Sequence, residues 1–443
     1  MLGECSPRVL KRLRTQHHPT LEHGRRGVRG GAAQRNFGTL LACLARRASI
    51  DARWRHLGYF PRGPTVTIAA FLPVERARDS LTPLFAIAAG PRGSIVAGGV
   101  SRPGSQGGEA LMLWRGDSAK RNVLRPAADH VRALLRTGEN DIAVADESGS
   151  VSVWCLRPPH TRQFELAAQQ TPVLALALLA RSAQRRDQTL ATGGVGGVVQ
   201  LWNLRTHERI GALAPSLPND SIFSMCTIRE GRDLFLCEQL AGVVEVCVGP
   251  EARPTMERRA AGYEPPLVDV RGKPRCVCAL RGAFSAAMGT SSGVRKVILR
   301  RATHPPAVRQ APSWTSLVLS AMWSTGEIKA IAAIEPAGAS DGVAAAERAP
   351  HRFVATGSSD GSLHIWSIAA LRCVCELTGH SASVCALSFR LHCGVRFLVS
   401  GENNGRCGRL LTHDIGAVLA EIGADSDDEI AVSANSARGT RGT

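Results

Sequence analysis

A short unit recurs along this chain of 443 residues, and its clearest copy runs from Phe353 to Trp366. An apolar run ends in Thr356-Gly, a Ser-Asp-Gly turn follows at Asp360, and a second apolar run ends in Trp366. Short apolar runs bounded by glycine and polar turns are typical of buried strands rather than helices. One pair of strands cannot bury its own apolar faces, so the copies are expected to stack side by side.

The strand-turn-strand pattern also occurs around Trp114, Trp154 and Trp202, so the four tryptophans lie 40, 48 and 164 residues apart. The longest gap equals about four repeats of about 41 residues. Weaker copies are Gly242 to Cys247, with Cys in the Trp position, Gly293 to Ile298, with Ile in that position, and Phe397 to about Leu411. Seven repeats are therefore expected.

The strands that open the repeats share a Val-x-Ala-Leu character. They begin at Val131, Val173, Val277, Ile328 and Val384. Small residues suit strands that crowd around a central axis, so these runs are expected to be the innermost strands.

These repeats resemble the WD-repeat family over residues 66–422, most specifically at 353–389. The resemblance implies an all-β fold, a seven-bladed β-propeller, with Trp114, Trp154 and Trp202 as structural blade residues. Its terminal segments are expected to be a basic N-terminal arm at 1–64 and a disordered tail at 423–443, with the propeller at 65–422.

In that family a turn Asp, a His after Gly, a Ser or Thr, and the Trp form a hydrogen-bonded network within a blade. Here Thr356, Asp360 and Trp366 belong to one repeat, whereas His380 and Ser400 belong to the next. The resemblance therefore implies structural roles for these five residues, and no repeat is expected to hold the full set.

Two segments compete to supply the outer strand of the last repeat. One is Val66–Leu72, near the N-terminus, and the other is Ala417–Ile422, which follows the last repeat directly. Pairing with the N-terminal segment is favoured because ring closure removes exposed strand edges.

Positive charge is concentrated near the N-terminus. The formal net charge is +17, and residues 1–64 hold 13 Lys and Arg against three acids, a net of +10. Three interpretations compete: a solvated tail, an arm held electrostatically by nucleic acid or an acidic partner, and a mitochondrial transit segment. Phe37, Leu41 and Leu44 at helical spacing favour a short helix within 37–57, which suits a transit segment or docking on the propeller.

Thirteen cysteines occur without any Cys-x-x-Cys spacing, and the histidines are scattered, so no metal or other cofactor is expected. Buried reduced thiols of an intracellular protein are the favoured interpretation. The pairs Cys276/Cys278 and Cys373/Cys375 are each expected on one face of a strand. No apolar run reaches 18 residues, so no membrane span is expected.

No catalytic motif stands out. The glycine-rich segments at 90–99 and 193–197 lack the Lys-Ser/Thr ending that grips phosphates and are interpreted as turns. A nucleophile elbow and a His-Glu-x-x-His pair are also missing. No catalytic residue is therefore predicted, and the chain is expected not to be an enzyme.

Two neighbouring repeats end alike, in Trp154-Cys-Leu-Arg157 and Trp202-Asn-Leu-Arg205. These endings resemble the Trp-Asp-x-Arg box of substrate receptors of cullin-4 ubiquitin ligases, in which the arginines face the linker subunit. The resemblance implies partner binding by Arg157 and Arg205, although Cys155 and Asn203 replace the Asp. The competing interpretation is that arginine, which is frequent here, simply caps exposed strand ends.

Three insertions are expected on the face that carries these arginines: residues 181–188, 300–314 and 335–350. Binding residues concentrate on such loops. The favoured function is a cytoplasmic or nuclear protein-interaction scaffold, in one form a receptor of a cullin-4 ligase. The alternatives are a ribonucleoprotein scaffold that uses the arm for weak nucleic-acid contact, and a scaffold imported into an organelle such as the mitochondrion.

Overall fold

The computed structural model describes residues 76–100, 110–115, 121–124, 130–166, 169–180, 188–228, 233–240, 242–248, 256–260, 274–281, 286–290, 295–302, 314–321, 326–335, 350–368, 372–377, 379–393, 395–416 and 419. The chain divides into two compact units, Met1–Gly63 and Pro64–Thr443, and every described residue belongs to the second. The predicted arm, its helix and the C-terminal tail lie outside the described residues.

The described strands pair into seven antiparallel sheets of four strands each. The first three sheets in chain order are β2 (Leu84–Ala89), β3 (Ile95–Gly99), β4 (Leu111–Trp114) and β5 (Arg121–Leu124); β6 (Val131–Arg136), β7 (Asp141–Asp146), β8 (Val151–Cys155) and β9 (Arg162–Leu166); and β10 (Val173–Ala180), β11 (Gln188–Gly194), β12 (Val199–Asn203) and β13 (Arg209–Leu213).

The next three sheets follow the same order of strands. They are β14 (Ile222–Ile228), β15 (Asp233–Glu238), β16 (Gly242–Val248) and β17 (Met256–Ala260); β18 (Pro274–Ala279), β19 (Ala286–Thr290), β20 (Arg295–Ala302) and β21 (Trp314–Ala321); and β22 (Ile328–Ile334), β23 (Phe353–Ser358), β24 (Leu363–Ser367) and β25 (Arg372–Leu377). A 3-10 turn, η1 (Pro91–Gly93), lies between β2 and β3.

The remaining sheet, which we call the closing sheet, joins the two ends of the repeat array. It contains β26 (Ser383–His392), β27 (Val395–Asn403), β28 (Gly408–Asp414) and, paired with β28, β1 (Arg76–Leu81). The outer strand therefore comes from the N-terminal side, as favoured, but from Arg76–Leu81 rather than Val66–Leu72, which lies outside the described residues. Ala417–Ile422 does not supply it: Gly416 and Leu419 are helical, and the Leu419 amide donates to the Ile415 carbonyl at 3.0 Å.

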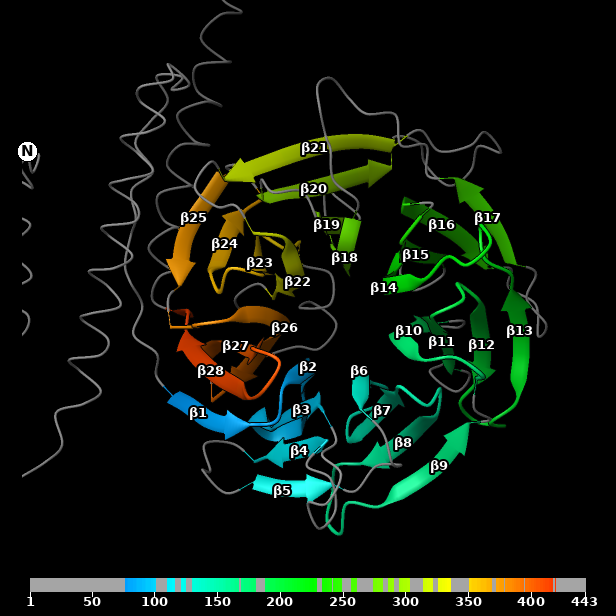
Figure 1. The fold of residues 1–443 in the computed structure, drawn as a ribbon, viewed down its shortest axis with the longest axis horizontal. Helices are drawn as coiled ribbons and strands as arrows, with labels where there is room; N and C mark the ends of the chain where they lie inside the picture. The colour runs from blue at the N-terminus through cyan, green and yellow to red at the C-terminus, as the bar shows by residue number, and fades with distance from the viewer. Residues whose placement is uncertain are drawn as a thin grey trace, which may run out of the picture. The chain divides into compact units, whose positions relative to one another are not determined.

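The first strands of the sheets form a closed inner ring. Each contacts the first strand of the next sheet, and β26 contacts β2 to complete the circle (Figure 1). Five of these strands contain the Val-x-Ala-Leu runs of the sequence, whose small side chains allow the close approach. The expected start at Val277 was wrong, because β18 begins three residues earlier, at Pro274. The predicted all-β propeller is confirmed.

The core lies between neighbouring sheets rather than within one. One cluster joins Leu363 and Ile365 of β24 to Val384 and Leu398 of the closing sheet. Another joins Trp114 and its neighbours to Val399 and Leu410 of that sheet. Burial of these side chains is the main stabilising contribution, at about 1.5–3 kcal/mol for each large aliphatic group.

The register of each sheet shows which residue occupies the Trp position. In every sheet, the first-strand residue just before the register shift pairs with one second-strand residue. The residue four places before that partner, in the second strand, pairs with one third-strand residue. That residue is Trp114, Trp154, Trp202 or Trp366 in four sheets, and Val246, Arg300 or His413 in the others. The predictions of Cys247, Ile298 and a last strand ending near Leu411 were wrong by one or two residues.

The turn between second and third strands needs glycine. Gly149 has φ 90° and Gly361 has φ 87°, backbone angles that other residues rarely adopt. A Cβ on Gly149 would lie 2.1 Å from the Gln169 carbonyl oxygen. This turn therefore packs against the segment that leads into the next sheet.

Candidate functional site

Arg157 and Arg205 occupy equivalent positions on neighbouring sheets. The residue before each donates its amide to a carbonyl at the beginning of the second strand: Leu156 to Asn140, just before β7, at 2.7 Å, and Leu204 to Gln188, the first residue of β11, at 3.1 Å. Both arginines are exposed. Since the sheets β6–β9 and β10–β13 are adjacent in the ring, these two rim arginines lie at the same end of two neighbouring sheets.

The two turns that carry the rim arginines are held differently. The Asn203 side-chain oxygen accepts the amides of Arg205 at 2.8 Å and Thr206 at 3.2 Å. A carboxylate could accept the same two bonds, so Asn203 performs the capping that an Asp would perform. Cys155 has no such oxygen, and the His160 amide instead donates to the Arg157 carbonyl at 2.7 Å.

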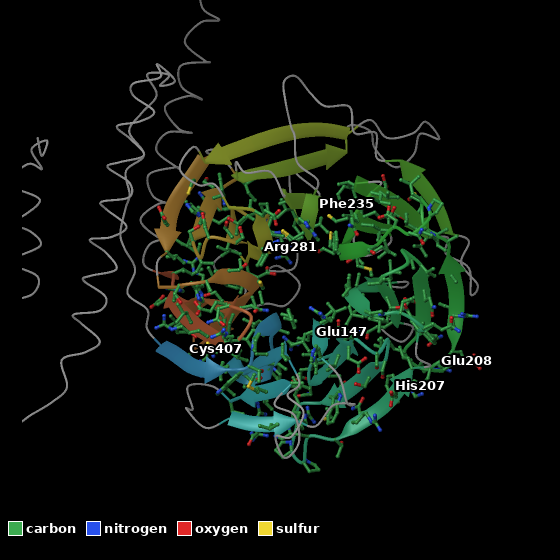
Figure 2. All side chains as sticks on the ribbon, in the orientation of Figure 1. Glu147, His207, Glu208, Phe235, Arg281 and Cys407 are labelled. Atoms are coloured by element: carbon green, nitrogen blue, oxygen red, sulfur yellow. The ribbon has the colours of Figure 1, made fainter. Side chains whose placement is uncertain are left out.

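Aromatic and basic groups tie the neighbouring turns together. The His207 ring stacks on Phe164 of β9, with centroids 3.8 Å apart and planes at 21°. Figure 2 shows His207 and Glu208 at the outer edge of the ring, beside β9 and β13. The pKa of His160 is lowered by burial and then by the charge of Arg115, so neutral His160 accepts a hydrogen bond at 3.1 Å from that guanidinium.

The three predicted insertions join strands in the expected way. Residues 181–187 and 336–349 connect first to second strands, and 303–313 connect a third strand to a fourth. In an antiparallel sheet both kinds of connection leave from one end, and Arg157 and Arg205 also lie between third and fourth strands. The insertions themselves lie outside the described residues, and partner binding on this face stays a prediction.

A buried polar network lies in the closing sheet. The His380 Nε2 lies 2.6 Å from Ser400 Oγ, and its Nδ1 lies 2.9 Å from Glu402 Oε2. Burial lowers the pKa of His380 against the opposing effect of Glu402, whose own pKa is lowered by His380 despite its burial. Neutral His380 therefore donates from Nδ1 to the carboxylate and accepts the Ser400 hydroxyl. Sequence reasoning missed Glu402, which does the work expected of a turn Asp.

His413 occupies the Trp position of this closing sheet. Its side chain is fully buried, and neither ring nitrogen has a hydrogen-bond partner among the described residues. Burial, with a smaller effect of His380, lowers the pKa of His413 to about 4. The imidazole is therefore held neutral at physiological pH, without the hydrogen bond that an indole makes elsewhere.

In the β22–β25 sheet, the Trp366 indole donates to Thr356 Oγ1 at 2.9 Å. Asp360 lies in the exposed turn, where its carboxylate accepts the Ser362 hydroxyl at 2.7 Å. The structure thus joins Thr356 to Trp366, while Asp360 orders the turn that precedes β24.

A comparable set, which the sequence did not predict, occurs in the β10–β13 sheet. The Trp202 indole donates to Thr192 Oγ1 at 3.1 Å, and the Gln169 amide donates to the same oxygen. Gln169 precedes Val173 by four residues, as His380 precedes Val384. That spacing was the signal that could have found it.

The cysteines of the described residues are free thiols, and several are packed in the core. Burial raises the pKa of Cys276 to about 12 and that of Cys278 further, so neither thiol is reactive at neutral pH. Both pack against one apolar cluster, as predicted. Cys373 and Cys375 do not share a face, because an irregularity in the pairing of β24 with β25 breaks the alternation between them.

One group of side chains has the composition of a metal site. Ligand atoms of Asp233, Glu245 and Cys247 all lie within 4.8 Å of one another, on β15 and β16. Two carboxylates and a thiolate are ligands that Zn²⁺ accepts. No sequence motif indicates this group, because its members come from two strands.

Within the described residues, no helix is both long enough and apolar enough to cross a membrane.

The comparisons with known proteins agree with this architecture. The family model described as "WD domain, G-beta repeat" matches residues 343–367, the stretch that includes β23 and β24. No curated protein matches the chain. The matched residues include Thr356, Asp360 and Trp366 of the clearest repeat.

Proposed function

Because the chain is a WD-repeat β-propeller protein, we propose that it is a non-catalytic scaffold that joins other proteins, with Arg157 and Arg205 as a contact for one partner. Propellers of this family serve protein–protein interaction, and the fold alone does not select the pathway. Residues on the surface of the propeller must therefore determine which partner the chain binds.

The observation that carries this proposal is the equivalence of the two rim arginines. They repeat one position on adjacent sheets, are both exposed, and lie in turns whose backbone is fixed by hydrogen bonds. A guanidinium offers a rigid fork that binds carboxylates with two parallel hydrogen bonds. Two such forks at a fixed spacing suit an acidic protein surface.

In its specific form, the proposal makes the chain a substrate receptor of a cullin-4 ubiquitin ligase, acting in the cytoplasm or nucleus. Arg157 and Arg205 would then contact the linker subunit of the ligase. Asn203 supports this role, because its side chain caps the turn that presents Arg205. Cys155 departs from the expected Asp, so Arg205 is expected to contribute more than Arg157.

The test is capture of the linker subunit by the full-length protein. Arg157→Ala with Arg205→Ala is expected to weaken capture by at least about tenfold, equivalent to about 1.4 kcal/mol. Arg162→Ala is a matched control, since it removes an exposed arginine of the β6–β9 sheet that pairs with Glu165 instead. Thermal unfolding should be unchanged in both, because exposed substitutions cost within about 0.5 kcal/mol.

Capture of the linker that survives the double substitution would contradict the role of the rim arginines. Recovery of ribosomal, splicing or organellar proteins without ligase components would instead favour the alternatives that use residues 1–64. Those alternatives rest on the net charge of +10 in that segment. They predict salt-sensitive RNA association, or a mature protein that lacks the segment.

A further inference from the structure

A ring of seven equivalent residues surrounds one mouth of the central channel. In every sheet the pairing of first and second strands shifts register at one residue near the start of the first strand, as a β-bulge does. We call these residues the channel-mouth ring: Phe85, Arg132, Leu174, Phe223, Arg275, Lys329 and Cys385.

The ring lines a cavity of about 240 Å³, and all seven side chains are half-buried. It lies at the end of the sheets that carries the turns between second and third strands, because Arg132 pairs at 2.9 Å with Glu147, which follows β7. Figure 2 shows Glu147 near the inner strands β6 and β7. The rim arginines lie at the opposite end.

Two of the three cationic side chains in the ring stack on an aromatic ring from the neighbouring sheet. The Arg132 guanidinium lies 4.0 Å from the centroid of the Phe85 ring, and that of Arg275 lies 4.5 Å from Phe223. Each pair comes from adjacent sheets. A guanidinium stacked on an aromatic face keeps the N–H groups at its edge available for a carboxylate.

Two of the three cations already have a carboxylate partner. Arg132 pairs with Glu147, and Lys329 pairs with Glu327. Arg275 has Phe223 as its partner, and no carboxylate of a described residue lies within ion-pair distance. Since β18 and β22 are neighbours, Arg275 and Lys329 stand side by side in the ring.

We infer that this channel mouth binds an acidic peptide segment of a protein partner, with a side-chain carboxylate against Arg275 and Lys329 and an apolar side chain against Leu174 and Phe223. The inference rests on the proposed scaffold function but uses the opposite face from the rim arginines. An extended peptide suits a cavity of this size, since one or two side chains fill it.

The same groups disfavour a nucleic acid. Glu147 and Glu327 repel a continuous phosphate backbone around the ring. A single carboxylate beside Arg275 and Lys329 is far less affected, because it lies near only Glu327, whose charge Lys329 already offsets. The faces of Phe85 and Phe223 that stack on guanidinium groups are not available for bases. Recognition of single strands depends on such faces.

The test uses the full-length protein and a short fluorescein-labelled, C-terminally amidated peptide of alternating glutamate and leucine, followed by fluorescence anisotropy. Arg275→Gln with Lys329→Gln is expected to raise the dissociation constant by at least about tenfold. Arg136→Gln is the matched control, because it removes an arginine from the other end of an inner strand. It should bind the peptide within about twofold of the wild type.

Three results would overturn the inference. They are no binding of the peptide by the wild type, equal binding of a glutamine-leucine peptide, and binding unchanged by the double substitution. Stronger capture of an oligouridylate through Arg275 and Lys329 would reassign the ring to nucleic acid. If the Arg275→Gln, Lys329→Gln variant lost peptide binding but still captured the linker subunit, this site would be separate from the one used in the proposed function. Thermal unfolding would show that the variants are folded.

Discussion

The β22–β25 sheet and the closing sheet share one backbone plan but fill it with different chemistry. In the first, Trp366 occupies the Trp position and its indole donates to Thr356. In the second, His413 occupies that position without a partner among the described residues, while Ser400, at the place of Thr356, bonds His380 instead. The same register therefore supports two ways of satisfying a buried hydroxyl.

This difference shows what the repeat requires and what it tolerates. Apolar packing between the sheets continues through both, since one cluster includes residues of each. The polar set can be divided between an indole, an imidazole and a carboxylate without loss of the four-stranded sheet. Interior packing holds the fold, whereas the hydrogen-bonded set differs from sheet to sheet.

The largest expected effect follows from truncating the residue at the Trp position. Trp366→Ala should lower the free energy of unfolding by about 3–5 kcal/mol, because it opens a cavity and leaves Thr356 without its donor. His413→Ala should cost at most about half as much, since it also removes a buried imidazole that has no partner among the described residues. Urea unfolding of both variants measures the difference. Equal losses would show that the two positions are energetically alike.

The second prediction concerns pH and the buried imidazole. The pKa of His413 is about 4 in the folded protein against an ordinary value of 6.5, so only the unfolded chain gains this proton between those values. The free energy of unfolding should therefore fall as pH decreases from about 6.5 to about 4. The loss from this one group approaches about 3 kcal/mol.

The His413→Phe variant isolates this contribution. It keeps every other titrating group, including His380 and Glu402, and so shares any general acid sensitivity of this basic chain. Its free energy of unfolding should decline less steeply than that of the wild type between pH 6.5 and 4. Parallel curves for the two proteins would rule out His413 as the cause.

Much of this plan follows from sequence, because the strong repeats carry local signals. The tryptophans, the Ser-Asp-Gly turn and the Val-x-Ala-Leu runs specify the second, third and first strands of a sheet. For the weak copies the predicted register was wrong: Cys247 and Ile298 were predicted at the Trp position, which Val246 and Arg300 occupy. Without a Trp to mark the position, an apolar strand can be shifted by one or two residues with little change in pattern.

Contacts between residues that are far apart in the sequence were also not predicted. Glu402 looks like a turn residue until the fold brings it to His380, and the bulges that form the channel-mouth ring leave no mark in composition. The two segments predicted for the closing strand are apolar, yet β1 carries two arginines and an aspartate. An outer strand has one face toward solvent, so its sequence need not be apolar.

The smallest of the three effects tests the network that distinguishes the closing sheet. His380→Leu should cost about 1–3 kcal/mol, because Glu402 would remain buried without the imidazole that donates to it. His380→Gln should recover part of this loss, since Gln169 fills the equivalent place and donates to Thr192 in another sheet. Denaturant unfolding at pH 7 ranks the three proteins. If His380→Gln unfolded with no larger free energy than His380→Leu, the closing sheet and the β10–β13 sheet would not share a common polar position. The hydrogen bonds to Glu402 and Ser400 would then depend on the geometry of the imidazole alone.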